Sequence, residues 1–180
     1  MTLRRWRRAA AIAAFGAVAL SSLADAQTAM KYELLPGDTV MQDGRTLFRV
    51  CRLSDGLLGG YVEREDNLAQ TGACFLYNES RAFGRSRIQD NAQVYGLVYD
   101  EALIGGDATV YGEVFGQAQV LDHATVRGRV YDHATVKDHG EIHGQAYGHS
   151  VVEGYAKVFG QIYGTARASD HEVIYGTRSR

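Results

Sequence analysis

The sequence predicts an all-β fold, a three-sided parallel β-solenoid with an N-terminal β-hairpin cap. Glycine recurs at a constant interval, at positions 96, 112, 128, 144, 160 and 176. Aliphatic residues keep the same period, as in the series Val94, Val110, Val126, Ile142, Val158 and Ile174. The units between them are too short and too rich in glycine to form helices.

Composition limits the classes of partner. The chain has 180 residues, is 46% hydrophobic and carries a formal net charge of −2. This length suits one folded domain, and the apolar fraction is typical of a packed core. Because no basic surface is indicated, we expect no nucleic-acid partner. The single proline, Pro36, lies outside the repeats, whose paired strands need their N–H groups.

Residues 1–26 resemble a signal peptide. Four arginines precede an apolar run over 9–20, and Ala24-Asp25-Ala26 is a small-residue cleavage site. This apolar run is too short to span a bilayer, so we expect no transmembrane segment in the mature chain. An uncleaved anchor helix is the alternative. We expect export to the periplasm or the outside of the cell.

Residues 27–57 are predicted to form a β cap. Residues 31–52 are typical of a hairpin that turns at Asp43-Gly44, and it would cover the bare edge of the first coil. Cys51 in this cap and Cys74 in the repeats are the only cysteines. An exported protein permits a disulfide between them, and two buried free thiols are the alternative.

Residues 58–177 carry the repeat. From Leu58 the units have six residues and predict 18-residue coils, and from Val94 the spacing of 4, 6 and 6 predicts 16-residue coils. The third residue of every unit from Gly60 to Gly176 is Gly, Asp or Asn, and these residues tolerate the left-handed backbone of a tight corner. Side chains alternate between a narrow aliphatic interior and solvent.

The C-terminal end is expected to be polar. Glu172 occupies an inward position that holds alanine in most earlier coils, and the tail 178–180 is Arg-Ser-Arg. Charge at this end would discourage end-to-end stacking of rods.

The unit Val120-Leu121-Asp122-His123-Ala124-Thr125 resembles the hexapeptide repeats of left-handed parallel β-helix proteins. That superfamily includes acyltransferases and γ-class carbonic anhydrases, which are commonly trimeric. The resemblance implies a left-handed coil. Residues 31–68 look like the start of uncharacterised bacterial and prophage hexapeptide-repeat proteins with a short β cap, from which little function transfers.

Outward aromatic residues form a stripe on the shortest side of the predicted coil. Its members are Tyr99, Phe115, Tyr131, Tyr147 and Tyr163. An exposed stripe would bind a sister subunit, another protein or a polysaccharide. The alternative is an intramolecular ladder in which each ring stacks on the next and stabilises the rod.

Histidines recur at predicted corners of adjacent coils. His123 lies one coil from His139, and His133 lies one coil from His149, which is close enough to share a metal. A γ-class carbonic anhydrase binds zinc between subunits through histidines, but its ligand set does not map onto this sequence. The alternative, which the sequence favours, is that these histidines replace asparagine at solvent-facing corners. We therefore expect no cofactor, with zinc as the alternative.

The favoured function is an exported, non-enzymatic structural or interaction module that self-associates along its aromatic stripe. A homo-oligomer is expected, and a trimer is typical of the superfamily. The alternative class is an enzyme, either a γ-carbonic-anhydrase-like zinc enzyme or a degenerate hexapeptide acyltransferase. No inserted loop interrupts the repeat over 94–177, and an exported protein lacks ready access to acyl-coenzyme A.

Overall fold

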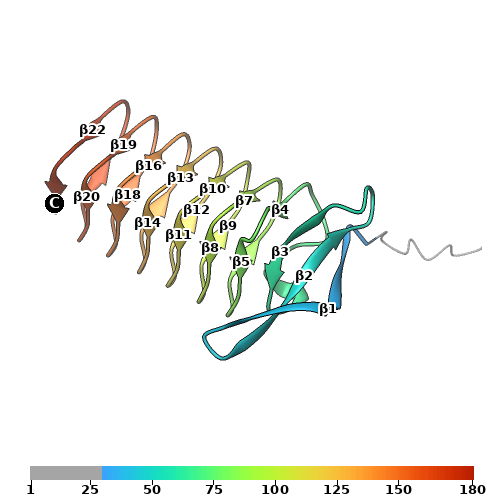
Figure 1. Ribbon diagram of the computed structural model, residues 1–180. Helices are drawn as coiled ribbons and strands as arrows, with labels where there is room; N and C mark the ends of the chain where they lie inside the picture. Colours follow the sequence, from blue (N-terminus) through green and yellow to red (C-terminus); the bar gives the residue numbers. More distant parts are fainter. Residues whose placement is uncertain (1–29) are drawn as a thin grey trace, which may run out of the picture.

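The computed structural model describes residues 30–180 as a rod of stacked coils with a hairpin at one end (Figure 1). The signal-peptide prediction for 1–26 lies outside the described residues. The inner coils each contribute one short strand to each of three sheets, so the three-sided parallel β-solenoid and its hairpin cap are confirmed. Within the described part of the chain, no helix is long and apolar enough to cross a membrane.

The three sheets run along the length of the rod. Sheet I contains β1 (Tyr32–Gln42), β2 (Arg45–Arg52), β3 (Leu58–Val62), β5 (Arg81–Ala82), β8 (Leu97–Val98), β11 (Glu113–Val114), β14 (Arg129–Val130), β17 (Gln145–Ala146), β20 (Gln161–Ile162) and β23 (Thr177–Arg178). Sheet II contains β4 (Phe75–Leu76), β7 (Gln93–Val94), β10 (Thr109–Val110), β13 (Thr125–Val126), β16 (Glu141–Ile142), β19 (Lys157–Val158) and β22 (Val173–Ile174). Sheet III contains β6 (Arg87–Ile88), β9 (Leu103–Ile104), β12 (Gln119–Val120), β15 (Thr135–Val136), β18 (Val151–Val152) and β21 (Arg167–Ala168).

The core is one narrow aliphatic column. In each of the strands β10, β11 and β12 the second residue points inward and is buried, while the first faces solvent. One coil buries Val110, Val114, Ala118, Val120 and Ala124. Partners in the parallel ladders occupy equivalent positions of successive coils, as in the pairing of Val110 with Val126. Similar side chains therefore stack on one another from coil to coil.

Two kinds of corner close each coil. At one kind the backbone is left-handed, as predicted, with a φ of 58° at Asp132 and 68° at Gly116. These aspartates also act between coils, because the Asp132 carboxylate accepts a hydrogen bond from the backbone N–H of Gly148, one coil further on, at 3.1 Å. Aspartate thus satisfies a corner N–H that the strand ladders leave unpaired.

The other kind of corner holds the regularly spaced glycines from Gly96 to Gly176, and there the left-handed prediction is wrong. These glycines do not have a positive φ. A Cβ at Gly144 would lie 1.8 Å from the backbone oxygen of Gly160, so glycine is required by the close approach of two backbones. At this corner His143 and Gly144 both donate to the Val158 carbonyl, a pattern that repeats along the rod.

The first coil is longer than the predicted 18-residue coil. Val62 pairs with Ala82, and Leu68 pairs with Ile88. Counting in units of six places Arg64 and Gln70 at inward positions, whereas Val62 and Leu68 are the buried residues. The two extra residues lie between Leu68 and Leu76, because Leu68 pairs 20 residues ahead, with Ile88, whereas Leu76 pairs 18 residues ahead, with Val94. The 3₁₀ helix η1 (Glu65–Asn67) precedes them and fits within the regular six-residue spacing from Val62 to Leu68.

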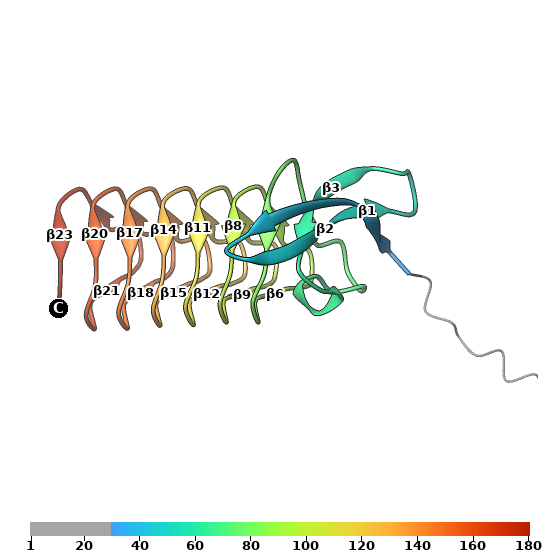
Figure 2. The same cartoon turned by 60° about the horizontal axis from the view of Figure 1, so that its bottom comes forward.

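The hairpin closes the N-terminal end of the rod (Figure 2). β1 and β2 pair antiparallel and turn at Asp43 and Gly44, as predicted, and β2 pairs with β3. Tyr32 is completely buried over the first coil, and its hydroxyl donates to the carbonyl of Leu68 at 2.5 Å. This environment raises the pKa of Tyr32, chiefly through burial and then through Glu65.

The C-terminal end carries an ion pair. Glu172 accepts a hydrogen bond from Arg178 at 2.8 Å and one from the backbone N–H of Ser169 at 3.1 Å. These contacts hold the pKa of Glu172 below its usual value, with the Arg178 bond as the largest cause. The end of the rod therefore carries charge, as the sequence indicates, beside the exposed side chains of Val173 and Tyr175.

Candidate functional site

A continuous stack of aromatic rings follows one edge of sheet I. We call it ladder 1, and its members are Phe83, Tyr99, Phe115, Tyr131, Tyr147 and Tyr163. Neighbouring ring centroids are 4.9 to 5.1 Å apart, and the ring planes lie within 8° of each other. All five predicted residues belong to it. Sequence reasoning missed Phe83, because the period of the repeat changes just after it.

The rings of ladder 1 are partly withdrawn from water. Phe83 is 5% exposed, whereas the five rings that follow are half-buried. Burial raises the pKa of the Tyr99 hydroxyl, with a smaller contribution from Glu113. Burial likewise raises the pKa of Tyr131, followed by the effect of Tyr147. Each inner ring uses its two faces on its neighbours, so the outer edges of these rings are what remains for another molecule.

The hairpin already occupies the N-terminal part of ladder 1. Leu47, Tyr61 and Phe83 form a small buried cluster of their own, against which Val40 and Tyr99 pack. The hairpin therefore lies over the first two rings, and the rings from Phe115 to Tyr163 continue beyond it. The sequence pattern does not reveal this cover, because the contact depends on how the hairpin bends.

A second stack follows the opposite edge of sheet I. Tyr77, Tyr95 and Tyr111 stack with centroids 4.9 Å apart. The guanidinium of Arg127 lies 5.6 Å from the Tyr111 centroid in the next coil. The column then continues with stacked rings at His143, Phe159 and Tyr175. The second, partial stripe is therefore one column interrupted by a single cation.

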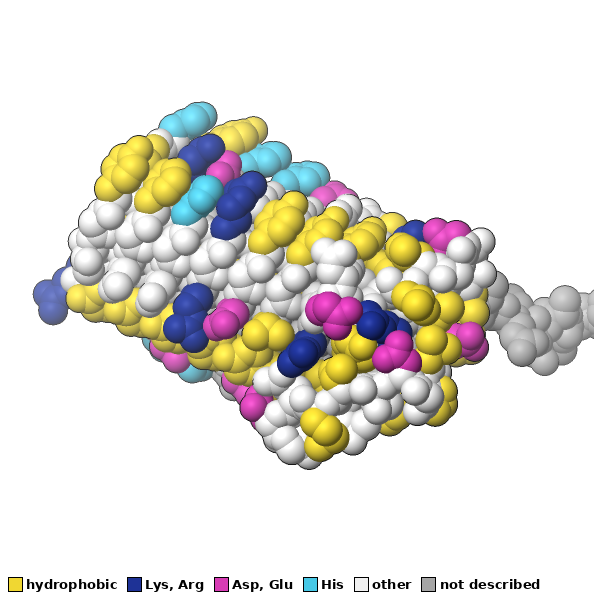
Figure 3. Space-filling view, viewed as in Figure 1, with side chains coloured by type: hydrophobic (Ala, Val, Ile, Leu, Met, Phe, Trp, Pro, Cys, Tyr) yellow, Lys and Arg dark blue, Asp and Glu magenta, His cyan; other side chains and the backbone are white. Residues whose placement is uncertain are grey.

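Between the two stacks, the face of sheet I is small and uncharged over its C-terminal half. Its outward residues there are Gln145, Gln161 and Thr177, beside the column of close-packed glycines. Figure 3 shows this pale strip between the two rows of hydrophobic side chains. Only nearer the hairpin does the strip carry charge, at the Glu113–Arg129 ion pair, with a separation of 2.9 Å.

The predicted histidine pairs do meet, but as stacked rings. His123 lies 4.9 Å from His139, and His133 lies 4.6 Å from His149, measured between ring centroids. Two nitrogens on one zinc ion are at most about 4.2 Å apart, since each Zn–N bond is about 2.1 Å. Stacked imidazoles direct their nitrogens side by side and not towards one point. Among residues 30–180, no group of three or more His, Cys, Asp or Glu side chains is arranged to hold a metal.

The stack at the His123 corner extends beyond the pair. Tyr155 stacks on His139 at 4.6 Å, and His171 stacks on Tyr155 at 5.1 Å. Asp107 lies 3.6 Å from Nδ1 of His123. Because tyrosine and histidine occupy equivalent positions in one stack, we infer that these rings stabilise the corner by stacking.

The two cysteines are unbridged in the structure, and the disulfide between Cys51 and Cys74 stays a prediction. Cys51 lies on β2, where it pairs with Leu58, and it is only partly buried. Cys74 is buried, and its sulfur lies 3.1 Å from Nζ of Lys31. Lys31 also donates to the Cys74 carbonyl at 2.8 Å, which ties the start of the hairpin to the first coil.

The chain matches no protein-family model, and comparison with curated proteins finds no similar sequence.

Proposed function

We propose that the protein is an exported, non-enzymatic β-solenoid that associates with copies of itself through the uncovered part of ladder 1. Its location rests on the signal-peptide pattern of residues 1–26. The coil is taken to be left-handed, and the repeats to be related to hexapeptide proteins, because of the unit pattern alone. The observation that carries the proposal is the run of half-buried rings from Phe115 to Tyr163, whose C-terminal rings lie beside the uncharged residues Gln145 and Gln161.

A second copy of this chain is the partner that the surface favours. The hairpin demonstrates how apolar side chains seat on this ladder, since Leu47 and Val40 cover its first rings. The same edge continues uncovered as far as Tyr163. Gln145 and Gln161 carry no charge that would have to be desolvated in an interface. A polysaccharide is less well matched, because sugar rings stack on aromatic faces, and the inner faces are occupied within the ladder.

The hairpin also favours an antiparallel arrangement of two rods. It lies over the N-terminal strands of sheet I (Figure 2), where its side chains pack on Phe83 and Tyr99. In a parallel pair or trimer the hairpins would meet at the same end and hold the ladders apart. In a two-fold antiparallel pair, each hairpin lies beyond the C-terminal rings of the other rod, and the uncovered rings of one rod meet those of the other in reverse order.

A charge placed beside the ladder tests this proposal without disturbing the stack. Gln161→Lys adds an exposed cation to β20, which a monomer tolerates and which a buried interface penalises. Gln119→Lys is the matched control, because Gln119 has the same exposed strand position in sheet III. Analytical ultracentrifugation over a concentration series should show a wild-type dimer, about tenfold or more weakened by Gln161→Lys and unchanged by Gln119→Lys. A wild-type monomer at all concentrations, or equal effects of both variants, would refute the proposal.

A further inference from the structure

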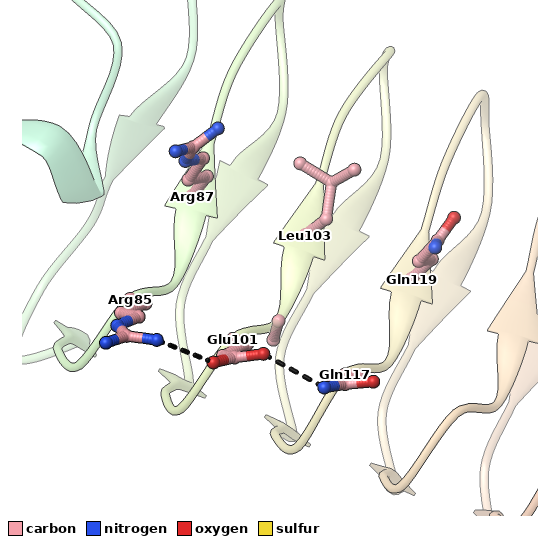
Figure 4. A pocket seen from close by; sticks show the side chains of 7 residues that line it. Arg85, Arg87, Glu101, Leu103, Gln117 and Gln119 are labelled. Carbon is pink, nitrogen blue, oxygen red and sulfur yellow. Dashed lines mark hydrogen bonds and ion pairs between the residues drawn. The ribbon is translucent and has the colours of Figure 1, made fainter.

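A polar groove crosses three coils at the edge of sheet III, on a different side of the rod from ladder 1. Its lining residues project in two rows from successive coils (Figure 4). The corner row is Arg85, Glu101 and Gln117, and the strand row is Arg87, Leu103 and Gln119. The hollow between them has a volume of about 400 Å³.

The corner row is internally satisfied. Glu101 accepts from Arg85 at 3.2 Å and from Gln117 at 3.0 Å, which links the three coils through one carboxylate. This chain holds the side chains in place along one bank of the groove. It also leaves the carboxyl oxygens and the Gln117 amide oxygen able to accept further hydrogen bonds from a ligand.

Arg87 in the strand row is not satisfied in this way. Within the described chain its guanidinium makes no ion pair and no side-chain hydrogen bond. Arg167 has the same register position on β21, and it is ion-paired with Glu153. An arginine with no protein partner, set in a hollow, is the natural contact for an anionic ligand.

Further hollows meet at the same arginine. Arg87 also borders a hollow of about 320 Å³ that reaches Gln70 and is lined by Glu65 and Asp66 as well. Another hollow, of about 190 Å³, reaches Arg64 and also borders Asp66. The depression therefore continues along the rod towards the hairpin. Such an open, elongated shape suits an extended ligand of repeated units better than a compact one.

We propose that this groove binds an acidic oligosaccharide, a chain of sugar units that bear carboxylates. The planar guanidinium of Arg87 matches a carboxylate through two parallel N–H···O bonds. The amides of Gln117 and Gln119 and the carboxylate of Glu101 match sugar hydroxyls, and Leu103 in the strand row supplies an apolar contact for a sugar ring. With two guanidiniums against one carboxylate, the lining of this hollow is net positive.

Calorimetric titration with a linear triuronic acid at low ionic strength tests the proposal. We expect millimolar or tighter binding, weakened about tenfold or more by Arg87→Gln, because a charge-assisted hydrogen bond is lost. Arg167→Gln is the matched control and should bind as the wild type does. Circular dichroism of Arg87→Gln should match the wild type, since Arg87 is exposed and holds no protein partner within the described residues.

Three further probes distinguish binding of an acidic sugar chain from binding of any sugar or of any anion. A neutral trisaccharide tests whether the carboxylates are needed, and inorganic phosphate and sulfate test whether any anion suffices. Binding of the triuronic acid that exceeds all three by about tenfold supports the proposal. The proposal is overturned by no triuronic acid binding at several millimolar, by equal binding of Arg87→Gln, or by equal affinity for a neutral sugar or a simple anion. None of these results depends on self-association through ladder 1.

Discussion

Replacing Gly144 with alanine is expected to separate two neighbouring coils. The new Cβ would lie 1.8 Å from the carbonyl oxygen of Gly160 and 2.5 Å from that of Phe159. Even a favourable C–H···O contact needs about 3.3 Å between carbon and oxygen, so the two backbones would have to move apart by more than an ångström. Both atoms in the way are backbone, which no rotamer change can relieve.

The cost follows from the bonds at that corner. His143 and Gly144 donate to the Val158 carbonyl at 2.8 and 3.0 Å, and Gln145 donates to the Gly160 carbonyl at 2.9 Å. Weakening three backbone hydrogen bonds costs about 0.5–1.5 kcal/mol each. Looser packing of the buried Ile142 adds to this, so we expect a loss of about 3–5 kcal/mol in the free energy of unfolding.

Gly176 provides the control within the same column. It has the equivalent corner position in the last coil, where an added Cβ meets nothing within 4 Å. Gly176→Ala should therefore stay within about 0.5 kcal/mol of the wild type. Urea unfolding followed by far-ultraviolet circular dichroism measures both, since Trp6 is the only tryptophan. A loss below about 1 kcal/mol for Gly144→Ala, or equal losses for both variants, would refute the steric argument.

Two further predictions concern charged side chains. Asp132→Ala should lower the free energy of unfolding by about 1–3 kcal/mol, because a residue with a φ of 58° becomes alanine and the bond to Gly148 is lost. Asp132→Gly relieves the strain and should lose less, and equal urea midpoints for the two variants would contradict this. The Glu153 pKa is lowered from its usual 4.5 by Lys137 and then by Arg167, so its stabilising contribution is present above pH 4.5 and is lost as pH falls through the lowered value. Melting temperatures below about pH 5 should accordingly fall less steeply for Glu153→Gln than for the wild type, and parallel profiles would exclude this linkage.

Most of the fold follows from the sequence because each inward position repeats. The series through Val110 and Val126 marks one wall of the prism at every coil, and Asp43-Gly44 marks the hairpin turn. Where the period is irregular the prediction fails. In the first coil Val62 and Leu68 take the inward positions, since two extra residues between Leu68 and Leu76 shift the register of the units before them.

The candidate sites were less predictable, since they depend on distances between elements. The pattern placed Tyr131 and Tyr147 on one side of the rod. Only the structure shows that their rings stack, with centroids 4.9 Å apart. The hairpin covers Phe83 because of the way its strands bend, and the repeat pattern does not predict this contact. The same holds for Arg87, which differs from Arg167 only in what the neighbouring coils place beside it.

Equivalent residues of successive coils stack on one another, so the length of the rod is set by its number of coils. A coil contacts the one before it and the one after it through the same pairings, as Val110 does with Val94 and Val126. Gain or loss of one coil would add or remove a single ring of ladder 1. The contacts between the remaining coils would stay the same. Chain length can therefore vary by whole coils during evolution, and the reach of the rod, the number of uncovered rings and the span between its two ends would change together.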